Sequence, residues 1–279
     1  DALQYYDTHC HPHDTLEDCV NLDTVEIEQM ALMGVHPKNW QDMLFVHERN
    51  PDHTLLGFGI HPWFTHEVLK HTDDEDEAKD EEEREEKWFT ELRSQLESHP
   101  ASFMGEIGLD KKAKSKQGQG TREEMWLGQM RAFRLQLQLA KELNKPVSAH
   151  CVGTYGLMFD LFRKWSKQSQ LPEKIALHSY GGSADMAKGF LGKSVKSKIY
   201  FGFSVAINMR SPKTKQVIKS IPIDRILPET DLDSPVRMEE DIHKIYQIIA
   251  DVHQLELEEA AQILNRNSRT FYNLQEDPQ

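Results

Sequence analysis

The alternation of short apolar runs with amphipathic segments most limits what this chain can fold into. Eight runs bounded by turn residues predict strands, and most are separated by segments with apolar residues at helical spacing. Strands that alternate with helices form βαβ units, and such units build a parallel sheet. The predicted strands cover residues 4–9, 25–33, 54–60, 102–107, 146–150, 174–178, 198–203 and 225–229.

The clearest predicted helix covers residues 122–144, where apolar residues such as Met130, Phe133 and Leu137 recur every three or four positions. It ends before Pro146, which cannot continue a helix. The second predicted strand is ambiguous, because residues 24–35 fit a helix equally well. Further helices are predicted at residues 155–167, 183–191, 212–220, 236–253 and 257–264.

Eight such units in a chain of 279 residues predict an α/β fold, a (β/α)₈ TIM barrel. Single barrels commonly have about 250 residues, so we expect one domain over residues 1–279 with an acidic insertion at about 66–87. An open, doubly wound sheet is the alternative, but eight strands would make it large. A Gly-rich phosphate loop of either the dinucleotide type or the P-loop type does not occur in the sequence.

The charge of the chain is concentrated in one stretch. Residues 73–86 contain eleven Asp and Glu against two basic residues, a net of −9 in a chain of net −13. This balance excludes a broadly basic surface that coats nucleic acid. The stretch is predicted to be a solvated loop or a charged helix end. The alternative is an acidic arm that docks a protein partner.

Three cysteines are too few and too unevenly numbered for a secreted disulfide framework. They favour a reducing, intracellular location, either cytoplasmic or nuclear. No stretch approaches the roughly 18 apolar residues that a membrane span needs, and the N-terminus lacks a signal-peptide pattern. We therefore expect no membrane partner.

Histidine and carboxylate side chains follow most of the predicted strands directly. In a barrel these strand ends meet at one mouth, where chemistry gathers. Each residue alone has an ordinary explanation, such as a core hydrogen bond or a helix cap. Together they form the mixed nitrogen and oxygen donor set that Zn, Mn, Co or Ni accepts, and Mg could use the oxygen part. The residues at these ends are His9, His11, His61, Glu106, Asp110, His150, His178 and Asp231.

The first strand ends in the segment "DTHCHPH". Side chains alternate along a strand, so His9 and His11 point the same way and Cys10 points towards the helices. The two imidazoles can therefore bind one ion together. His13 follows Pro12 and is predicted to be a loop residue.

The motifs "YDTHCH", "GIHPW", "GEIGLD", the His after "KPV", "LHSYGGS" and "PETD" occur in the order seen in TatD-type metal-dependent hydrolases. The resemblance extends from Tyr6 to about Pro235. It implies a TIM barrel of the amidohydrolase type with a two-metal site, and many members of the family are deoxyribonucleases. The chain looks most like a fungal branch that includes a protein described as interacting with a subunit of a cell-cycle complex, the anaphase-promoting complex.

The resemblance also implies a role for each residue at the mouth. Two divalent ions (Zn, Mg or Mn) would activate a water that attacks the phosphodiester, and Asp231 and Glu106 would be catalytic. His61 and Asp110 would lie beside the substrate. The first ion would be held by His9, His11 and Asp231, the second by His150 and His178, and Glu106 would bridge the two.

The chain departs from the family pattern at three places. The acidic stretch after His61 lengthens a loop, and a segment of net −9 near the mouth would repel a polyanionic substrate. Val152 stands where the family often has an Arg that grips phosphate. Leu232 and Asp233 follow "ETD", so Asp233 rivals Asp231 as a ligand. The predicted function is a metal-dependent deoxyribonuclease that acts on DNA or another phosphoester. The alternatives are a hydrolase of a different ester or amide, and a barrel that acts mainly as a partner-binding module through its acidic insertion.

Overall fold

The computed structural model describes residues 3–69, 75–113 and 121–274, apart from the side chains of residues 20, 21, 23 and 75–86. Within these ranges, eight strands form one sheet in sequence order, and each strand is parallel to the next one along the chain. The predicted α/β TIM barrel is confirmed, including the ambiguous second strand. The strands are β1 (Tyr6–Cys10), β2 (Gln29–Met33), β3 (Thr54–Phe58), β4 (Phe103–Asp110), β5 (Val147–Val152), β6 (Lys174–Leu177), β7 (Lys198–Phe203) and β8 (Ile226–Pro228).

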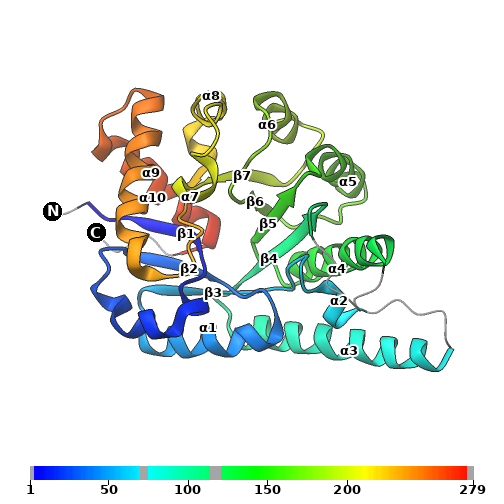
Figure 1. The fold of residues 1–279 in the computed structure, drawn as a ribbon. Helices are drawn as coiled ribbons and strands as arrows, with labels where there is room; N and C mark the ends of the chain where they lie inside the picture. Colours follow the sequence, from blue (N-terminus) through cyan, green and yellow to red (C-terminus); the bar gives the residue numbers. More distant parts are fainter. Residues whose placement is uncertain (1–2, 70–74, 114–120, 275–279) are drawn as a thin grey trace.

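Helices surround the strands, with α10 behind the barrel and α3 along one edge (Figure 1). No helix in the described part of the chain is both long and apolar enough to cross a bilayer. Short 3₁₀ turns lie at Pro12–Thr24 (η1), Ile223–Arg225 (η2) and Pro235–Arg237 (η3). The helices are α1 (Pro37–Arg49), α2 (Thr65–Val68), α3 (Glu75–Ser98), α4 (Arg122–Glu142), α5 (Tyr155–Lys167), α6 (Ala184–Leu191), α7 (Val205–Asn208), α8 (Thr214–Ser220), α9 (Met238–His253) and α10 (Leu257–Tyr272).

The first and last strands meet at the end of the barrel where both strands finish. Thr8 Oγ1 donates to the Pro228 carbonyl at 2.8 Å, and the Asp231 N–H donates to the His9 carbonyl at 2.9 Å. The His11 N–H donates to the Leu232 carbonyl at 2.8 Å. These bonds fix the segment after β8 against β1, and so bring residues from the two ends of the chain to the same mouth.

The opposite end of the barrel is filled by aromatic side chains of α10. Phe271 is fully buried, and its ring lies 5.2 Å from that of Tyr200, centroid to centroid. The Tyr272 hydroxyl donates to the Thr8 carbonyl at 2.6 Å. Side chains from six strands complete this cluster, namely Ala31, Met33, Leu55, Phe103, Ala176, Tyr200 and Leu227.

Two predictions about helices need correction or completion. The helix predicted at residues 257–264 continues to Tyr272. Apolar spacing did not predict the additional turns, because the buried face there carries Asn265, Asn267 and Ser268. The backbone of residues 75–86 forms the first half of α3, as the alternative of a charged helix end predicted. The side chains of this acidic stretch lie outside the described residues.

Candidate metal centre

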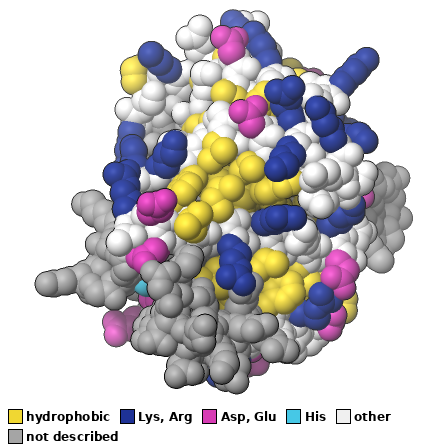
Figure 2. Space-filling model, turned by 90° about the vertical axis from the view of Figure 1, so that its right-hand side faces the viewer, with side chains coloured by type: hydrophobic (Ala, Val, Ile, Leu, Met, Phe, Trp, Pro, Cys, Tyr) yellow, Lys and Arg dark blue, Asp and Glu magenta, His cyan; other side chains and the backbone are white. Residues whose placement is uncertain are grey.

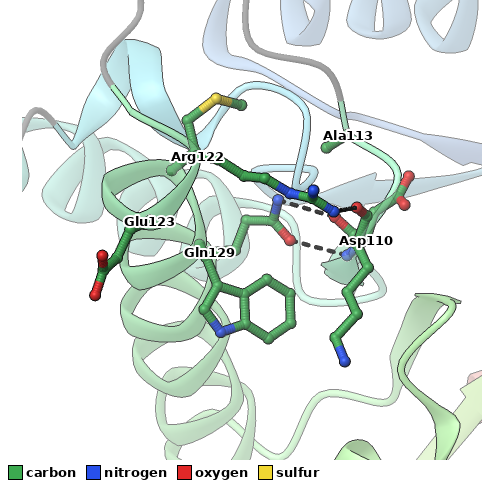
Figure 3. A pocket seen from close by; sticks show the side chains of 8 residues that line it. Asp110, Ala113, Arg122, Glu123 and Gln129 are labelled. Atoms are coloured by element: carbon green, nitrogen blue, oxygen red, sulfur yellow. Dashed lines mark hydrogen bonds between the residues drawn. The ribbon is translucent and has the colours of Figure 1, made fainter.

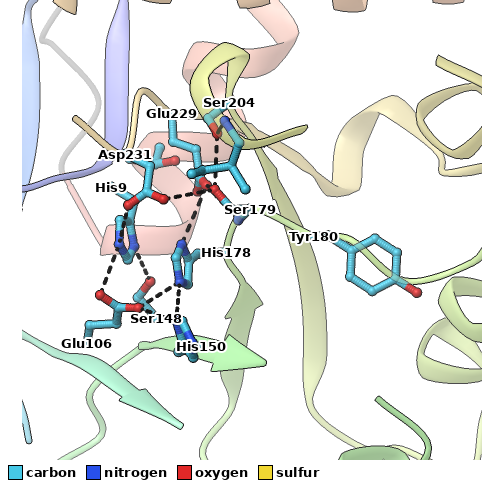
Figure 4. Close-up of polar contacts among 12 residues, drawn as sticks. His9, Glu106, Ser148, His150, His178, Ser179, Tyr180, Ser204, Glu229 and Asp231 are labelled. Atoms are coloured by element: carbon cyan, nitrogen blue, oxygen red, sulfur yellow. Dashed lines mark hydrogen bonds and ion pairs between the residues drawn. The ribbon is translucent and has the colours of Figure 1, made fainter. Parts of the chain in front are cut away.

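The structure brings the six predicted metal ligands together at the C-terminal ends of the strands (Figure 4). They come from five different strands or from the loop directly after one. A cavity of about 460 Å³ opens over them. The six residues are His9 and His11 from the end of β1, Glu106 from β4, His150 from β5, His178 after β6 and Asp231 after β8.

Glu106 lies at the centre of the cluster and is 3% exposed. Its Oε2 lies 3.4 Å from His9 Nε2 and 3.3 Å from His11 Nε2. Its Oε1 lies 2.8 Å from His150 Nδ1 and 2.7 Å from His178 Nε2. The two oxygens of one carboxylate therefore face two separate pairs of imidazoles.

The first pair of imidazoles also faces Asp231. The Nε2 atoms of His9 and His11 lie 3.2 Å apart, and Asp231 Oδ1 lies 3.5 Å and 3.6 Å from them. His9 Nδ1 lies 2.9 Å from Ser148 Oγ. When that nitrogen carries the hydrogen, the Nε2 lone pair points at Glu106. Imidazole nitrogens and carboxylate oxygens around one point are a donor set that fits a divalent ion.

Asp233, the rival ligand, takes a different position. It is exposed and lines the rim of the cavity. Asp231 instead adopts a left-handed backbone conformation with φ of 55°, which is rare for a residue other than glycine. Its carboxylate thereby turns into the cluster of histidines. The geometry favours Asp231 over Asp233 as the carboxylate that would bind an ion.

The second pair of imidazoles is held from outside by two further carboxylates. His150 Nε2 lies 3.3 Å from Asp110 Oδ2, so Nδ1 is the nitrogen that faces Glu106. His178 Nδ1 lies 3.7 Å from Glu229 Oε1, and its Nε2 faces Glu106. The hydrogen bond to Asp110 fixes both the tautomer and the orientation of His150. Glu229 lies too far from His178 Nδ1 for a hydrogen bond and acts on that ring through its charge.

Glu229 is itself fixed in a closed pocket. It accepts hydrogen bonds from the Ser179 N–H at 2.5 Å and from Ser179 Oγ at 2.7 Å. A Cβ at Gly202 would lie 2.1 Å from Glu229 Oε2, so glycine at this position leaves the room that the carboxylate needs. Asp7 plays a similar part in β1, because it accepts from Thr230 N at 3.0 Å and so fixes the residue before Asp231.

Burial and charge act in opposite directions on the titratable groups of the cluster. Burial raises the pKa of Asp231, but its hydrogen bond to His11 and the charge of His178 outweigh burial and bring that pKa to about 2. Burial lowers the pKa of His11, but its hydrogen bonds to Asp231 and Glu106 raise it to about 10. When no ion is bound, Asp231 is therefore ionised at neutral pH and paired with a positively charged His11.

His61 lies beside the cluster, with Nε2 3.4 Å from Glu106 Oε1. The Trp63 N–H donates to His61 Nδ1 at 3.1 Å, which leaves the ring hydrogen on Nε2. Burial lowers the pKa of His61 to about 4, so the ring stays neutral. His61 therefore presents an N–H donor to the cavity rather than a lone pair that could bind an ion.

Asp110 is enclosed by donors. Its carboxylate accepts from Trp63 Nε1 and from the Lys112 N–H, both at 2.7 Å. Gln129 of α4 accepts from the Asp110 N–H at 2.8 Å and donates to its carbonyl at 3.2 Å (Figure 3). Burial raises the pKa of Asp110, but the hydrogen bond from His150 outweighs it and brings that pKa to about 2. These bonds make Asp110 a residue that positions His150. Contact of Asp110 with substrate stays a prediction.

The structure also places the other residues of the first histidine segment. Cys10 is fully buried, and its Sγ lies 3.5 Å from the Ala31 carbonyl, as expected for a residue that faces away from the mouth. His13 lies in η1 rather than in an open loop and is 1% exposed. Burial lowers its pKa to about 3.

Two outer partners of the histidines, Ser148 and Glu229, were not predicted from the sequence. Ser148 lies two residues before His150, so it shares one face of β5 with it. Glu229 lies two residues before Asp231 in "PETD". Each of these residues lies two positions before a predicted ligand, and this spacing could have indicated it. The spacing does not distinguish a ligand from a residue that supports one.

Known proteins resemble this chain along nearly its whole length. A family model described as TatD related DNase matches residues 6–273. Cut9-interacting protein scn1 of Schizosaccharomyces pombe is 24% identical over 95% of this chain and 97% of that protein. An uncharacterized deoxyribonuclease of Saccharomyces cerevisiae is 27% identical over 82% of this chain and 84% of that protein. The solved structure of YjjV, a TatD homologue of Escherichia coli, has a similar fold, with a TM-score of 0.70 at 24% identity and coverage of 96% and 98%.

Proposed function

The chain belongs to the TatD family of metal-dependent hydrolases, and we propose that it is a deoxyribonuclease that hydrolyses phosphodiester bonds of DNA. The position of Glu106 carries this proposal. Its two carboxylate oxygens face two separate pairs of imidazoles, the arrangement expected of a residue that bridges two ions. Pairs of divalent ions are a common device for hydrolysing phosphoesters.

We assign the ligands of two divalent ions (Zn, Mg or Mn) accordingly. When bound, such ions lower the pKa of a coordinated water and neutralise charge on the phosphate oxygens. Glu106 would contact both ions through its separate oxygens. The remaining ligands would be His9, His11 and Asp231 for one ion, and His150 and His178 for the other.

Two side chains at the cavity contact the reacting groups in this proposal, one as a proton acceptor and one as a hydrogen-bond donor. Asp231 is the acceptor of the proton from the attacking water, because it is an ionised carboxylate on the wall of the cavity. His61 donates its Nε2–H to a phosphate oxygen, since its other nitrogen is occupied by the Trp63 N–H.

The proposal is tested by metal content and hydrolysis in two matched variants. Asp231→Asn should lose bound metal and reduce hydrolysis of bis(p-nitrophenyl) phosphate and of labelled oligodeoxynucleotides at least a hundredfold. Asp233→Asn removes the same charge from the rim of the cavity and should leave both properties close to wild type. Metal is measured by mass spectrometry of the purified protein. Wild-type protein that holds two ions and cleaves no phosphodiester would refute the proposal.

Hydrolysis of a different kind of bond is the competing activity, and Val152 supports it. That residue stands at the end of β5, where an Arg would grip a phosphate. Carboxyl esters, lactones and amides should therefore be assayed beside the phosphodiesters in the same metals. Faster turnover of one of these substrates than of DNA, lost in His178→Ala, would assign the centre to that chemistry.

We also propose a protein partner for the acidic segment of residues 73–86. The support is the name of the fission-yeast relative, Cut9-interacting protein, together with its similarity over 95% of this chain. Deletion of residues 73–86 should abolish capture of the counterpart of Cut9 and leave the metal content unchanged. Capture that survives the deletion would exclude this segment as the docking element.

A further inference from the structure

A second cavity adjoins the one over the metal centre. It encloses about 470 Å³ and is lined by the loop after β6 and by the start of α8, including Tyr180, Ser183 and Lys213. Ile207, in α7 after β7, lines both cavities and is 40% exposed. A flexible ligand that is bound at the metal centre can therefore continue over Ile207 into the second cavity.

Each of the two cavities has an unpaired cation on its wall. Arg210 lines the cavity over the metal centre, and Lys213 lines the second one. Both are exposed, and neither forms an ion pair with any residue in the described part of the chain. Asp185, an acidic residue on the second cavity, has its Oδ1 3.6 Å from Lys188 Nζ. Carboxylates also line the cavity over the metal centre, so a negatively charged group there depends on Arg210 and on bound ions, whereas Lys213 can pair with a negative charge in the second cavity.

Positive and negative charges are also separated along the chain. Residues 145–222, which form β5 to α8, contain thirteen Lys and Arg against three Asp and Glu, a net of +10 in a chain of net −13. Figure 2 shows the face of α4, α5 and α6, with Lys and Arg side chains spread around a hydrophobic area. Residues 75–86 of the acidic stretch form the first half of α3, which lies on the other side of the barrel from α6 and α8 (Figure 1). A polyanion is therefore attracted to the β6–β7 side of the mouth and repelled from the α3 side.

We propose that Arg210 and Lys213 bind successive phosphates of a single DNA strand that runs from the metal centre over Ile207 into the second cavity. This inference rests on the proposed function and adds the path of the substrate beyond the bond that is cleaved. Arg210 supplies a phosphate-binding cation at the mouth, where Val152 supplies none. A cavity of this size holds one small ligand-sized group, such as a single nucleotide, rather than a duplex.

The path is tested by the affinity of the metal-loaded protein for a fluorescein-labelled oligothymidylate with phosphorothioate linkages. Arg210→Gln and Lys213→Gln should each weaken binding about tenfold, the effect of losing a charge-assisted hydrogen bond. Each should also make the slope of log Kd against log salt shallower by about 0.7, the value for one phosphate contact on a single strand. The matched control is Lys193→Gln, an equal change of charge in the connection before β7, at the opposite end of the barrel.

The two proposals fail in different ways. Equal weakening by Lys193→Gln, or no weakening by Arg210→Gln and Lys213→Gln, would overturn the proposed path whatever the enzyme hydrolyses. Absence of hydrolysis of bis(p-nitrophenyl) phosphate by wild-type protein, with binding that still depends on Arg210 and Lys213, would refute the nuclease proposal and support the path. A mononucleotide should bind wild type and Lys213→Gln equally, because it does not reach the second cavity.

Discussion

At the scale of single residues, the orientation of three imidazoles is set by the partner of the other ring nitrogen. Ser148 takes that position for His9, Asp110 for His150, and the Trp63 N–H for His61. In the neutral ring, Asp110 accepts the hydrogen of His150 and leaves a lone pair facing Glu106, and Ser148 can do the same for His9, whereas the Trp63 N–H donates to His61 and leaves an N–H there. Side chains of the same type in one cavity therefore have different chemistry.

This difference predicts unequal effects for two histidine variants. His178→Gln should lose metal, because it removes a lone-pair donor that faces Glu106. His61→Gln should keep the metal content of wild type and lower kcat about a hundredfold, the usual effect of removing one hydrogen-bond donor to the transition state. Metal analysis and steady-state kinetics on bis(p-nitrophenyl) phosphate, run on both variants, provide the measurement. Loss of an ion from His61→Gln would make His61 a ligand and contradict the tautomer inferred from Trp63.

The sequence was enough to predict which side chains gather at the mouth, but it did not indicate how they are held. His150 and His178 end separate strands, and the C-terminal ends of barrel strands must meet. Glu229 and Asp231 both lie in one short segment, and the pattern does not tell which of them faces the histidines. Their roles depend on the left-handed turn at Asp231 and on the space beside Gly202, which arise only from packing.

At the scale of elements, α10 shows why some boundaries escape prediction. Its buried face carries amide and hydroxyl side chains that replace apolar ones after Leu264. Asn267 Nδ2 donates to the Ile223 carbonyl at 2.7 Å and to the Ile226 carbonyl at 2.9 Å. The helix is thus attached to β8 by hydrogen bonds, and hydrophobic spacing alone cannot detect such contacts. The helix at residues 155–167, whose buried face is mostly apolar, was predicted with its observed bounds.

The last turn of α10 should matter for stability out of proportion to its length. Phe271→Ala would leave a cavity at the closed end of the barrel, between Tyr200 and Tyr272, and should lower the free energy of unfolding by about 3–5 kcal/mol. Val236→Ala, at a position 77% exposed, is the control and should change it by less than about 0.5 kcal/mol. Urea unfolding followed by circular dichroism measures both. A change below about 1 kcal/mol for Phe271→Ala would show that α10 does not close the barrel in solution.

At the scale of the whole molecule, the two ends of the barrel have opposite character. One end is packed with aromatic and aliphatic side chains, and the other encloses charged groups that burial disfavours. Those charges are tolerated because carboxylates and imidazoles neutralise one another, or because an ion replaces the imidazole protons. Metal, protons and folding are therefore coupled at the mouth.

This coupling predicts how pH affects the stabilisation by metal. In the metal-free protein the pKa of His11 is raised to about 10 by Asp231 and Glu106, so its stabilising contribution is complete below about pH 6.5 and is lost as pH rises towards 10. An ion needs neutral imidazoles, so its binding releases protons and tightens over the same range. The difference in Tm between metal-loaded and chelator-treated protein should therefore grow steadily from pH 6 to pH 9, as measured by calorimetry. Glu106→Gln should show little difference in Tm between the two states at any pH. In wild type, a difference in Tm that narrows as pH rises would mean that the ion does not displace protons from these histidines.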